Sequence, residues 1–355
     1  MKQSEKLLFK ALCSFKSKEF DETLLRSATP IVLGHLFFNR MQAISYGTLN
    51  SHDLLRRVNR EFRNSLRDSY TQNLEKNSSF YRSVGYLSDI LNDCTCRYAM
   101  LKGAYLCRYY PDGYRTSNDI DLLVLPEDVT QIGNALSCAG FKQGSIRNGE
   151  FVPATRKEII ASKMTRGETV PYIKEMALPG MRYLEVDINF SLDYKNGDAP
   201  VLKDILSRAK RKDIGGMEVQ TLEESDFFIH LCSHLYKEAT TLPWVEMMRD
   251  MTLYKYSDIY LLLEDMTDED VNRIFKRSEK MGMGKVCAFA IKQTAELFDV
   301  SNTYAVEIAR SFLRSDPEFL HRVVSPKDKK SFVYHEKDVS ERFFAANRKD
   351  LLKEV

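Results

Sequence analysis

One short segment, residues 119–125, constrains the fold of this chain more than any other part of the sequence. It reads Asp-Ile-Asp-Leu-Leu-Val-Leu, an apolar run interrupted by two acids. Residues two apart on a β-strand project from the same face, so Asp119 and Asp121 point together while Ile120 and Leu122 point into a core. A lone pair of this kind also occurs at solvated strand edges. The pattern predicts a strand that is buried on one side and acidic on the other.

The acidic face of this strand predicts a metal site. Two buried carboxylates side by side repel each other, and one of them keeps its proton unless a cation neutralises the pair. Mg²⁺, or Mn²⁺ in its place, binds oxygen ligands and removes that conflict. Two such ions can hold the attacking and leaving oxygens of a phosphoryl displacement. We therefore expect Asp119 and Asp121 to be metal ligands and catalytic residues.

A third acid is needed to complete this arrangement. Residues 183–190 read Tyr-Leu-Glu-Val-Asp-Ile-Asn-Phe and alternate with period two, which predicts another strand. Asp187 in this segment is our expected third metal ligand and catalytic residue. Glu185 faces the same way and is the competing candidate.

A second constellation lies just before the acidic strand. Residues 98–101 predict a short strand, followed by Lys102, Gly103 and Ala104 and then a short helix. Glycine lets a backbone approach a ligand closely, and helix N-termini offer free N–H groups to phosphate oxygens. Lys102 adds a positive charge, and Arg115 and Asn118 precede the acids. We expect all five residues to contact a nucleotide, although each signal is weak when taken alone.

The chain divides into three regions by the periodicity of its apolar residues. Residues 1–95 and 224–355 carry helical periodicity, and residues 96–223 contain the strand candidates, including 217–222. Residues 141–180 are expected to hold a strand, a loop and a charged insertion. Residues from about 325 onwards are expected to be a surface helix or a mobile tail.

Composition excludes several other classes of protein. The net charge of +2 does not indicate a nucleic-acid partner, although the arginine-rich stretch 56–67 keeps RNA binding as an alternative. Seven cysteines are scattered along the chain, and Cys94 and Cys96 are interpreted as reduced. Neither a signal peptide nor a membrane-spanning helix is visible. We expect a cytoplasmic protein with no membrane partner.

These residues carry a family resemblance. The block from Leu101-Lys-Gly-Ala through Tyr110-Pro-Asp-Gly-Tyr-Arg to Asn118-Asp-Ile-Asp-Leu-Leu-Val resembles the DNA polymerase β-type nucleotidyltransferase superfamily. Within it, the chain is most similar to the bacterial uncharacterised nucleotidyltransferase family. The similarity extends over about residues 30–300 and is strongest over 98–125.

The resemblance implies an α+β fold, with a small mixed sheet, flanking helices, and N- and C-terminal helical regions. It also implies Mg²⁺ dependence, a nucleoside triphosphate (NTP) donor, and metal ligation by Asp119, Asp121 and Asp187. Two features depart from the superfamily. Ala104 stands where the superfamily usually has serine or glycine, so a hydroxyl contact is missing, and the interval from Gly103 to Asp119 is long.

Two pairs of residues in the later helices are weighed separately. Lys255 and Asp258 share a helix face, which fits either an intrahelical ion pair or a contact to nucleotide or acceptor. We include both among the expected nucleotide-binding residues. His230 and His234 also share a face, and we favour packing or hydrogen bonding over zinc because the zincin glutamate is absent.

The sequence therefore predicts a Mg²⁺-dependent nucleotidyltransferase. It would move a nucleoside monophosphate from an NTP to a hydroxyl of a small molecule, a protein or an RNA, with release of pyrophosphate. The alternative is a weakly active or inactive module that binds a nucleotide or a partner on the same fold, which the alanine at position 104 favours.

Overall fold

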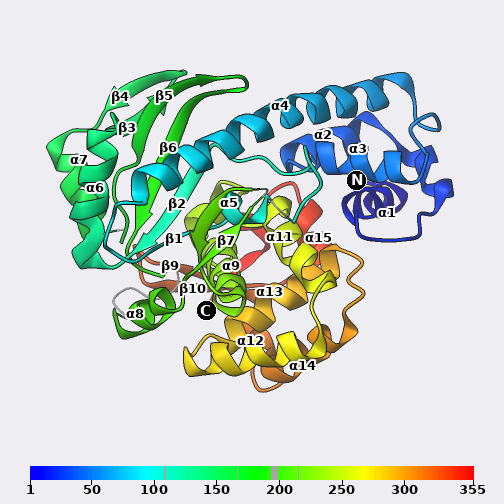
Figure 1. The fold of residues 1–355 in the computed structure, drawn as a ribbon. Helices are drawn as coiled ribbons and strands as arrows, with labels where there is room; N and C mark the ends of the chain where they lie inside the picture. Colours follow the sequence, from blue (N-terminus) through cyan, green and yellow to red (C-terminus); the bar gives the residue numbers. More distant parts are fainter. Residues whose placement is uncertain (108, 166, 193–198, 215) are drawn as a thin grey trace. The chain divides into compact units, whose positions relative to one another are not determined.

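The structure is a computed structural model that describes residues 1–355 apart from 108, 166, 193–198 and 215 (Figure 1). The described chain divides into two compact units. One unit is Thr71–Phe227, and the other combines Met1–Tyr70 with Phe228–Val355. The helices of both chain ends therefore belong to one unit. The three regions expected from the sequence, 1–95, 96–223 and 224–355, remain a prediction.

An eight-stranded mixed sheet forms the framework of the Thr71–Phe227 unit, in the order β4-β3-β5-β6-β2-β1-β8-β7. Its strands are β1 (Tyr98–Met100), β2 (Asp119–Val124), β3 (Lys142–Arg147), β4 (Glu150–Pro153), β5 (Tyr172–Leu178), β6 (Met181–Asn189), β7 (Lys210–Asp213) and β8 (Glu218–Thr221). Strand β2 is parallel to β6 and β1 is parallel to β8, whereas the other described pairs are antiparallel. The expected α+β class is confirmed, with a sheet larger than the small one anticipated.

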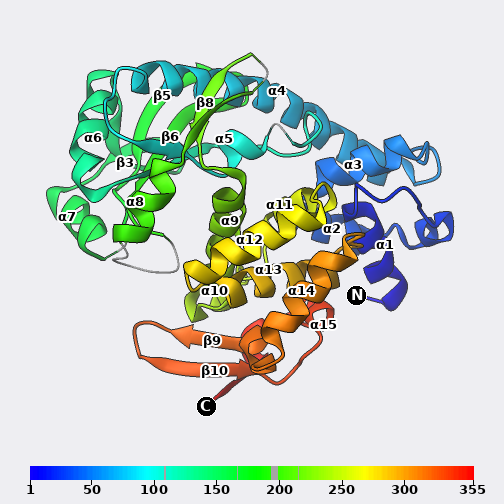
Figure 2. The ribbon, with the colours of Figure 1, turned by 60° about the horizontal axis from the view of Figure 1, so that its bottom comes forward.

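Helices flank this sheet. They are the second half of α4 (Arg60–Leu91), α5 (Gly103–Leu106), the 3-10 turn η2 (Pro126–Asp128), α6 (Val129–Cys138), α7 (Arg156–Thr165) and α8 (Ala199–Ser207). Both α6 and α7 lie beside the β3–β4–β5 end of the sheet in the two ribbon views (Figures 1 and 2). In α4, Phe80, Val84, Leu87 and Leu91 recur at helical spacing and are at most 1% exposed. This apolar stripe explains why a mostly polar helix is stable here.

The segment 141–180 is more regular than expected. It forms β3, β4, α7 and β5 instead of one strand with a loop and a charged insertion. Asn148 and Gly149 connect β3 to β4 and both have positive φ, 51° and 81°. Asn-Gly is the preferred pair for a tight hairpin turn that needs positive φ at both central positions. The hairpin signal was therefore present in the sequence.

The second unit is mainly helical. Its first segment contains α1 (Gln3–Cys13), η1 (Glu22–Ser27), α2 (Pro30–Phe38) and α3 (Gln42–Ser51), and its second contains most of α9 (Glu224–Ala239), then α10 (Leu242–Glu246), α11 (Leu253–Glu264), α12 (Asp268–Lys280), α13 (Gly284–Leu297) and α14 (Thr303–Leu313). The two segments pack together through α1, where the Phe9 ring lies 5.7 Å from Phe343 and 5.4 Å from Phe344. Lys16 pairs with Asp265 at 3.0 Å.

The expectation for the C-terminal residues was wrong. Instead of a surface helix or a mobile tail, they complete a three-stranded sheet in the order β11-β10-β9 (Figure 2). The elements are η3 (Pro317–His321), β9 (Arg322–Ser325), β10 (Lys330–Tyr334), α15 (Val339–Phe344), η4 (Arg348–Leu351) and β11 (Leu352–Glu354). Val323 and Tyr334 form a buried cluster with Val245 of α10. These strands are only three to five residues long, and long-range pairing, which a local sequence pattern does not reveal, stabilises them.

Across the described residues, no helix combines the length and the apolar character needed to cross a membrane.

Candidate active site

The two acidic strands lie next to each other in the sheet. Strands β2 and β6 run parallel, with Asp119 level with Glu185 and Asp121 level with Asp187. Since neighbouring strands share their faces, all these carboxylates project to one side. The alternating residues Ile120, Leu122 and Val186 are 0% exposed. The expected strands and their alternation are confirmed, and both Asp187 and Glu185 are brought to the pair of aspartates.

Each aspartate of β2 has a hydrogen-bonding partner. Asp121 is 7% exposed, and its Oδ1 lies 3.0 Å from Nζ of Lys102. The side-chain amide of Asn189 donates to the same oxygen at 3.4 Å. Asp119 stands at the exposed start of the strand, where its Oδ1 accepts a hydrogen bond of 2.7 Å from Oγ of Ser117. Hydrogen bonds therefore connect the two β2 aspartates to Lys102, Asn189 and Ser117.

The carboxylates of the two strands repel one another. Burial, followed by the charges of Asp121 and Asp119, raises the pKa of Asp187 well above its ordinary value. Burial and the charge of Asp119 also raise the pKa of Glu185. For Asp119 itself desolvation by the surrounding protein acts in the same direction, but the Ser117 hydrogen bond, a backbone hydrogen bond and the charges of Lys102 and Arg115 together outweigh it and lower the pKa. The face thus concentrates negative charge that a cation would relieve.

This donor set fits Mg²⁺ or Mn²⁺ by its chemistry, because every candidate ligand is a carboxylate oxygen. Within the described part of the chain, however, no three acidic, histidine or cysteine side chains already converge on one point. Lys102 and Ser117 engage the two β2 aspartates instead. Side-chain rotation is therefore required before Asp119, Asp121 and Asp187 can share an ion.

The Lys-Gly segment forms a strained turn after β1. The amide of Ala104 donates to the carbonyl of Leu101 at 3.3 Å, and Lys102 adopts φ 45° and ψ −118°. These angles are close to the first central position of a type II′ turn, which favours glycine. A lysine there stores backbone strain of the kind that accumulates at functional sites. The turn is fixed to β2 because the Leu101 amide donates to the Asp121 carbonyl at 2.9 Å.

Glycine at position 103 is required by packing. A Cβ on Gly103 would stand 2.9 Å from Cβ of Ser117, 3.0 Å from its Oγ and 3.4 Å from Nη1 of Arg115. Gly103 and Ala104 are both buried. The glycine therefore makes room for two side chains, which is a different reason from the close ligand approach expected from the sequence. Whether the turn contacts a phosphate remains a prediction.

The other expected nucleotide-binding residues divide between the two units. Arg115 is 9% exposed and lies at the turn, while Asn118 is exposed and its carbonyl accepts from the Glu185 amide at 3.4 Å. Lys255 and Asp258 belong to α11 in the second unit. Their contact with a nucleotide therefore remains a prediction.

The α11 residues lie in a polar and aromatic environment. Lys255 forms an ion pair with Glu238, and its ammonium lies 5.6 Å from the Trp244 ring and 5.8 Å from the Tyr254 ring. Asp258 is 4% exposed. His234 contacts the same Glu238 at 3.3 Å, which agrees with the expectation of hydrogen bonding for this histidine.

Sequence reasoning missed three polar residues of the acidic face: Ser117, Asn189 and Glu168. Asn189 follows Asp187 by two positions in β6, so the strand period could have indicated it, whereas Ser117 lies before the start of β2. Glu168 forms an isolated bridge with Asn189, and its charge contributes to the raised pKa of Asp187. No local signal identified Glu168, because its segment reaches the sheet only through tertiary pairing.

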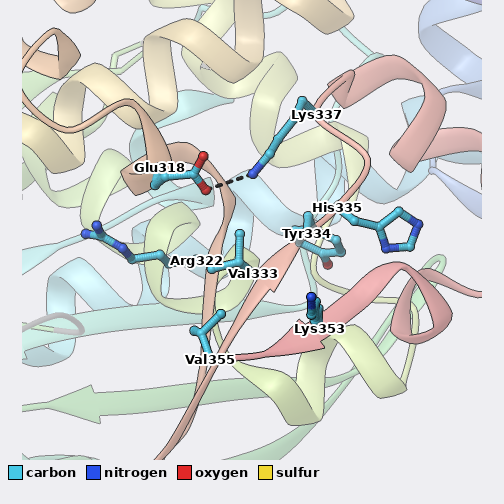
Figure 3. A pocket seen from close by; sticks show the side chains of 8 residues that line it. All are labelled: Glu318, Arg322, Val333, Tyr334, His335, Lys337, Lys353 and Val355. Atoms are coloured by element: carbon cyan, nitrogen blue, oxygen red, sulfur yellow. Dashed lines mark hydrogen bonds and ion pairs between the residues drawn. The ribbon is translucent and has the colours of Figure 1, made fainter.

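A surface hollow of about 430 Å³ is formed by other residues, in the C-terminal part of the second unit (Figure 3). It is lined by Glu318, Arg322, Val333, Tyr334, His335, Lys337, Lys353 and Val355. Lys337 and Glu318 form an ion pair of 2.7 Å across it. None of the expected catalytic or nucleotide-binding residues lines this hollow, so the carboxylates of β2 and β6 remain the better candidate site.

Comparisons with known proteins identify the family of the chain. No curated protein matches the chain. A solved structure of an antigenic nucleotidyltransferase-like protein from Paracoccidioides brasiliensis is 16% identical, with 58% of this chain and 91% of that chain covered and a TM-score of 0.33. The sequence pattern of the uncharacterised nucleotidyltransferase family matches residues 34–299, which include both acidic strands and the Lys-Gly turn. Because this match spans more than half of the chain, the protein belongs to the uncharacterised nucleotidyltransferase family.

Proposed function

We propose that the protein is an active, Mg²⁺- or Mn²⁺-dependent enzyme that transfers a nucleoside monophosphate from an NTP to a hydroxyl acceptor. The observation that carries this proposal is the register of β2 and β6, which sets Asp121 level with Asp187 and Asp119 level with Glu185. The strained Lys102 turn lies against the same face, with its ammonium 3.0 Å from Asp121.

Each side chain then has a role. Asp119, Asp121 and Asp187 would hold the metal, which neutralises phosphate charge and favours attack at the α-phosphorus when it is bound. Lys102 and Arg115 would bind the phosphates, with Gly103, Ala104 and Asn118 around them. Asp187, as a carboxylate next to the metal, would take the proton of the acceptor hydroxyl. The acceptor oxygen bonds to the α-phosphorus as the bond to the β-phosphate oxygen breaks, and pyrophosphate leaves.

The partners in this proposal are an NTP donor and an acceptor that is a small molecule, a protein or an RNA end. Lys255 and Asp258 are proposed to contact the nucleotide or the acceptor.

All seven cysteines are free thiols, which suits a reducing compartment such as the cytoplasm.

The experiment that tests this proposal compares wild-type protein with Asp119→Ala and Asp121→Ala. Each NTP is supplied in turn with Mg²⁺ and cell extract, and pyrophosphate release and label transfer are measured. Both variants should lose at least about a hundredfold in rate, since they remove metal ligands. Asp89→Ala, an exposed aspartate of α4, is the matched control. Full activity in either site variant rules the mechanism out.

A second function is favoured by the buried turn. Gly103 and Ala104 offer no exposed polar side chain, and Lys102 and Ser117 already engage the aspartates. A module that binds a nucleotide without turning it over fits these observations. Calorimetry separates the two functions, because this module would bind an NTP tightly while releasing no pyrophosphate across a broad panel of acceptors.

A further inference from the structure

Ser117 lies between the two halves of the candidate site. Its Oγ donates to Oδ1 of Asp119 at 2.7 Å. The same oxygen is 3.0 Å from the position that a Cβ on Gly103 would occupy. One hydroxyl therefore bridges the acidic face of β2 and the turn after β1.

The turn beneath this hydroxyl presents little polar surface of its own. Gly103 and Ala104 are buried, and neither carries a polar side-chain atom. The atoms that cover Gly103 belong to Ser117 and to Arg115, whose Nη1 stands 3.4 Å from the same Cβ position. An anion that approaches Gly103 from this side meets a hydroxyl and a guanidinium before it meets the backbone.

We infer that Ser117 is a phosphate ligand of the bound NTP, an inference that rests on the proposed function. A serine hydroxyl has one proton, which rotates toward the best acceptor. In the structure that proton is donated to Asp119. With Asp119 engaged by a metal, the Ser117 hydroxyl would be able to donate its proton to a phosphate oxygen instead, beside the cations of Lys102 and Arg115. Charged phosphate oxygens are strong acceptors.

The competing role for Ser117 is to orient Asp119 alone. The two roles differ in what the hydroxyl's removal does to each ligand. A phosphate ligand contributes to NTP affinity and leaves the affinity for free Mg²⁺ nearly unchanged. A residue that only positions Asp119 changes both affinities together.

The test is titration calorimetry of the full chain with Mg²⁺ alone and with each of ATP, GTP, CTP and UTP in the presence of Mg²⁺. Ser117→Ala should weaken NTP binding about tenfold or more, the size expected for one hydrogen bond to a charged group. Ser117→Thr keeps the hydroxyl and should stay within about threefold of wild type. Ser137→Ala is the control, since its hydroxyl donates to the Gly133 carbonyl at 2.7 Å in α6.

Three results would overturn this assignment. Unchanged NTP affinity in Ser117→Ala removes the phosphate contact. An equal loss of Mg²⁺ and NTP affinity reduces Ser117 to a residue that positions Asp119. Absence of NTP binding by wild-type protein removes the proposed function itself, and the wild-type titration distinguishes that failure from the first two.

Discussion

The ammonium group of Lys102 lies 3.0 Å from Oδ1 of Asp121 and joins the turn after β1 to the acidic face of β2. The backbone under this ammonium has φ 45°, in the region that favours glycine. The position of the cation and the strain of the turn are therefore linked in one residue. Replacement of Lys102 by glycine should therefore relieve the backbone strain while it removes the cation.

Replacing Lys102 separates these two effects. Lys102→Gly relieves the positive φ, whereas Lys102→Ala keeps it, and both remove the cation. We expect the glycine variant to be more stable than the alanine variant by about 1–3 kcal/mol, while both lose NTP binding. Urea unfolding and calorimetry measure the two quantities. An alanine variant as stable as the glycine variant would show that the turn is not strained.

Asp187→Asn should stabilise the metal-free protein at neutral pH. Because the pKa of Asp187 is raised in the folded protein, its ionisation costs folding free energy above the unfolded-chain pKa of about 4. The cost is absent below that pH and grows as the pH rises towards the folded-state value. Each pKa unit of such a shift costs about 1.4 kcal/mol of folding free energy, so the gain should be of at least this order.

The measurement for Asp187→Asn is thermal unfolding in EDTA across a pH series. The difference from wild type should shrink as the pH falls to about 4. Addition of Mg²⁺ should stabilise wild type and leave the variant nearly unchanged. Asp89→Asn serves as the control for loss of one surface charge. A variant less stable than wild type at neutral pH contradicts the repulsion inferred here.

Glu185 and Asp187 can be told apart by activity. Both face the β2 aspartates, but Asp187 is level with the buried Asp121, whereas Glu185 is level with the exposed Asp119. We expect Asp187→Asn to lose at least about a hundredfold in rate and Glu185→Gln to keep most of it. The readout is pyrophosphate release with Mg²⁺. The reverse order would make Glu185 the third ligand.

Gly103→Ala should disrupt the turn. The added methyl would stand 2.9 Å from Cβ of Ser117, closer than folded proteins allow. Overpacking of this kind costs about 1–3 kcal/mol. The second substitution Ser117→Gly removes the opposing atoms, so the double variant should recover stability but not NTP affinity. Equal stability of Gly103→Ala and wild type in urea would falsify the packing role.

The buried ion pair of the C-terminal segment should contribute strongly to the stability of its unit. Arg348 and Asp250 form a buried ion pair of 2.7 Å, with side chains 3% and 1% exposed. Arg348→Met leaves Asp250 buried without this partner and should cost about 3–5 kcal/mol. The adjacent Lys349 pairs with Glu246 at the surface, so Lys349→Met should leave the urea midpoint almost unchanged. Similar midpoints for the two variants contradict this role.

The sequence determined the local parts of the site. Period-two alternation was enough to predict that Asp119 and Asp121 share a face and that residues 183–190 form a strand, because those relations depend on backbone geometry within one strand. Pro30 likewise marked the start of α2, since proline suits the first turn of a helix. The family resemblance rested on the same local blocks.

Tertiary structure decided which of these parts meet. The parallel register that sets Asp121 level with Asp187 joins segments separated by α6, the β3–β4 hairpin, α7 and β5, and no local pattern encodes that pairing. The contact of Ser117 with Gly103 arises because the chain returns past the turn as it enters β2. The strands after residue 321 also depend on pairing between segments that are distant in the sequence. Their charged residues have weak local preferences, and hydrogen bonds to distant strands, together with burial of Tyr334 and Arg348, stabilise them.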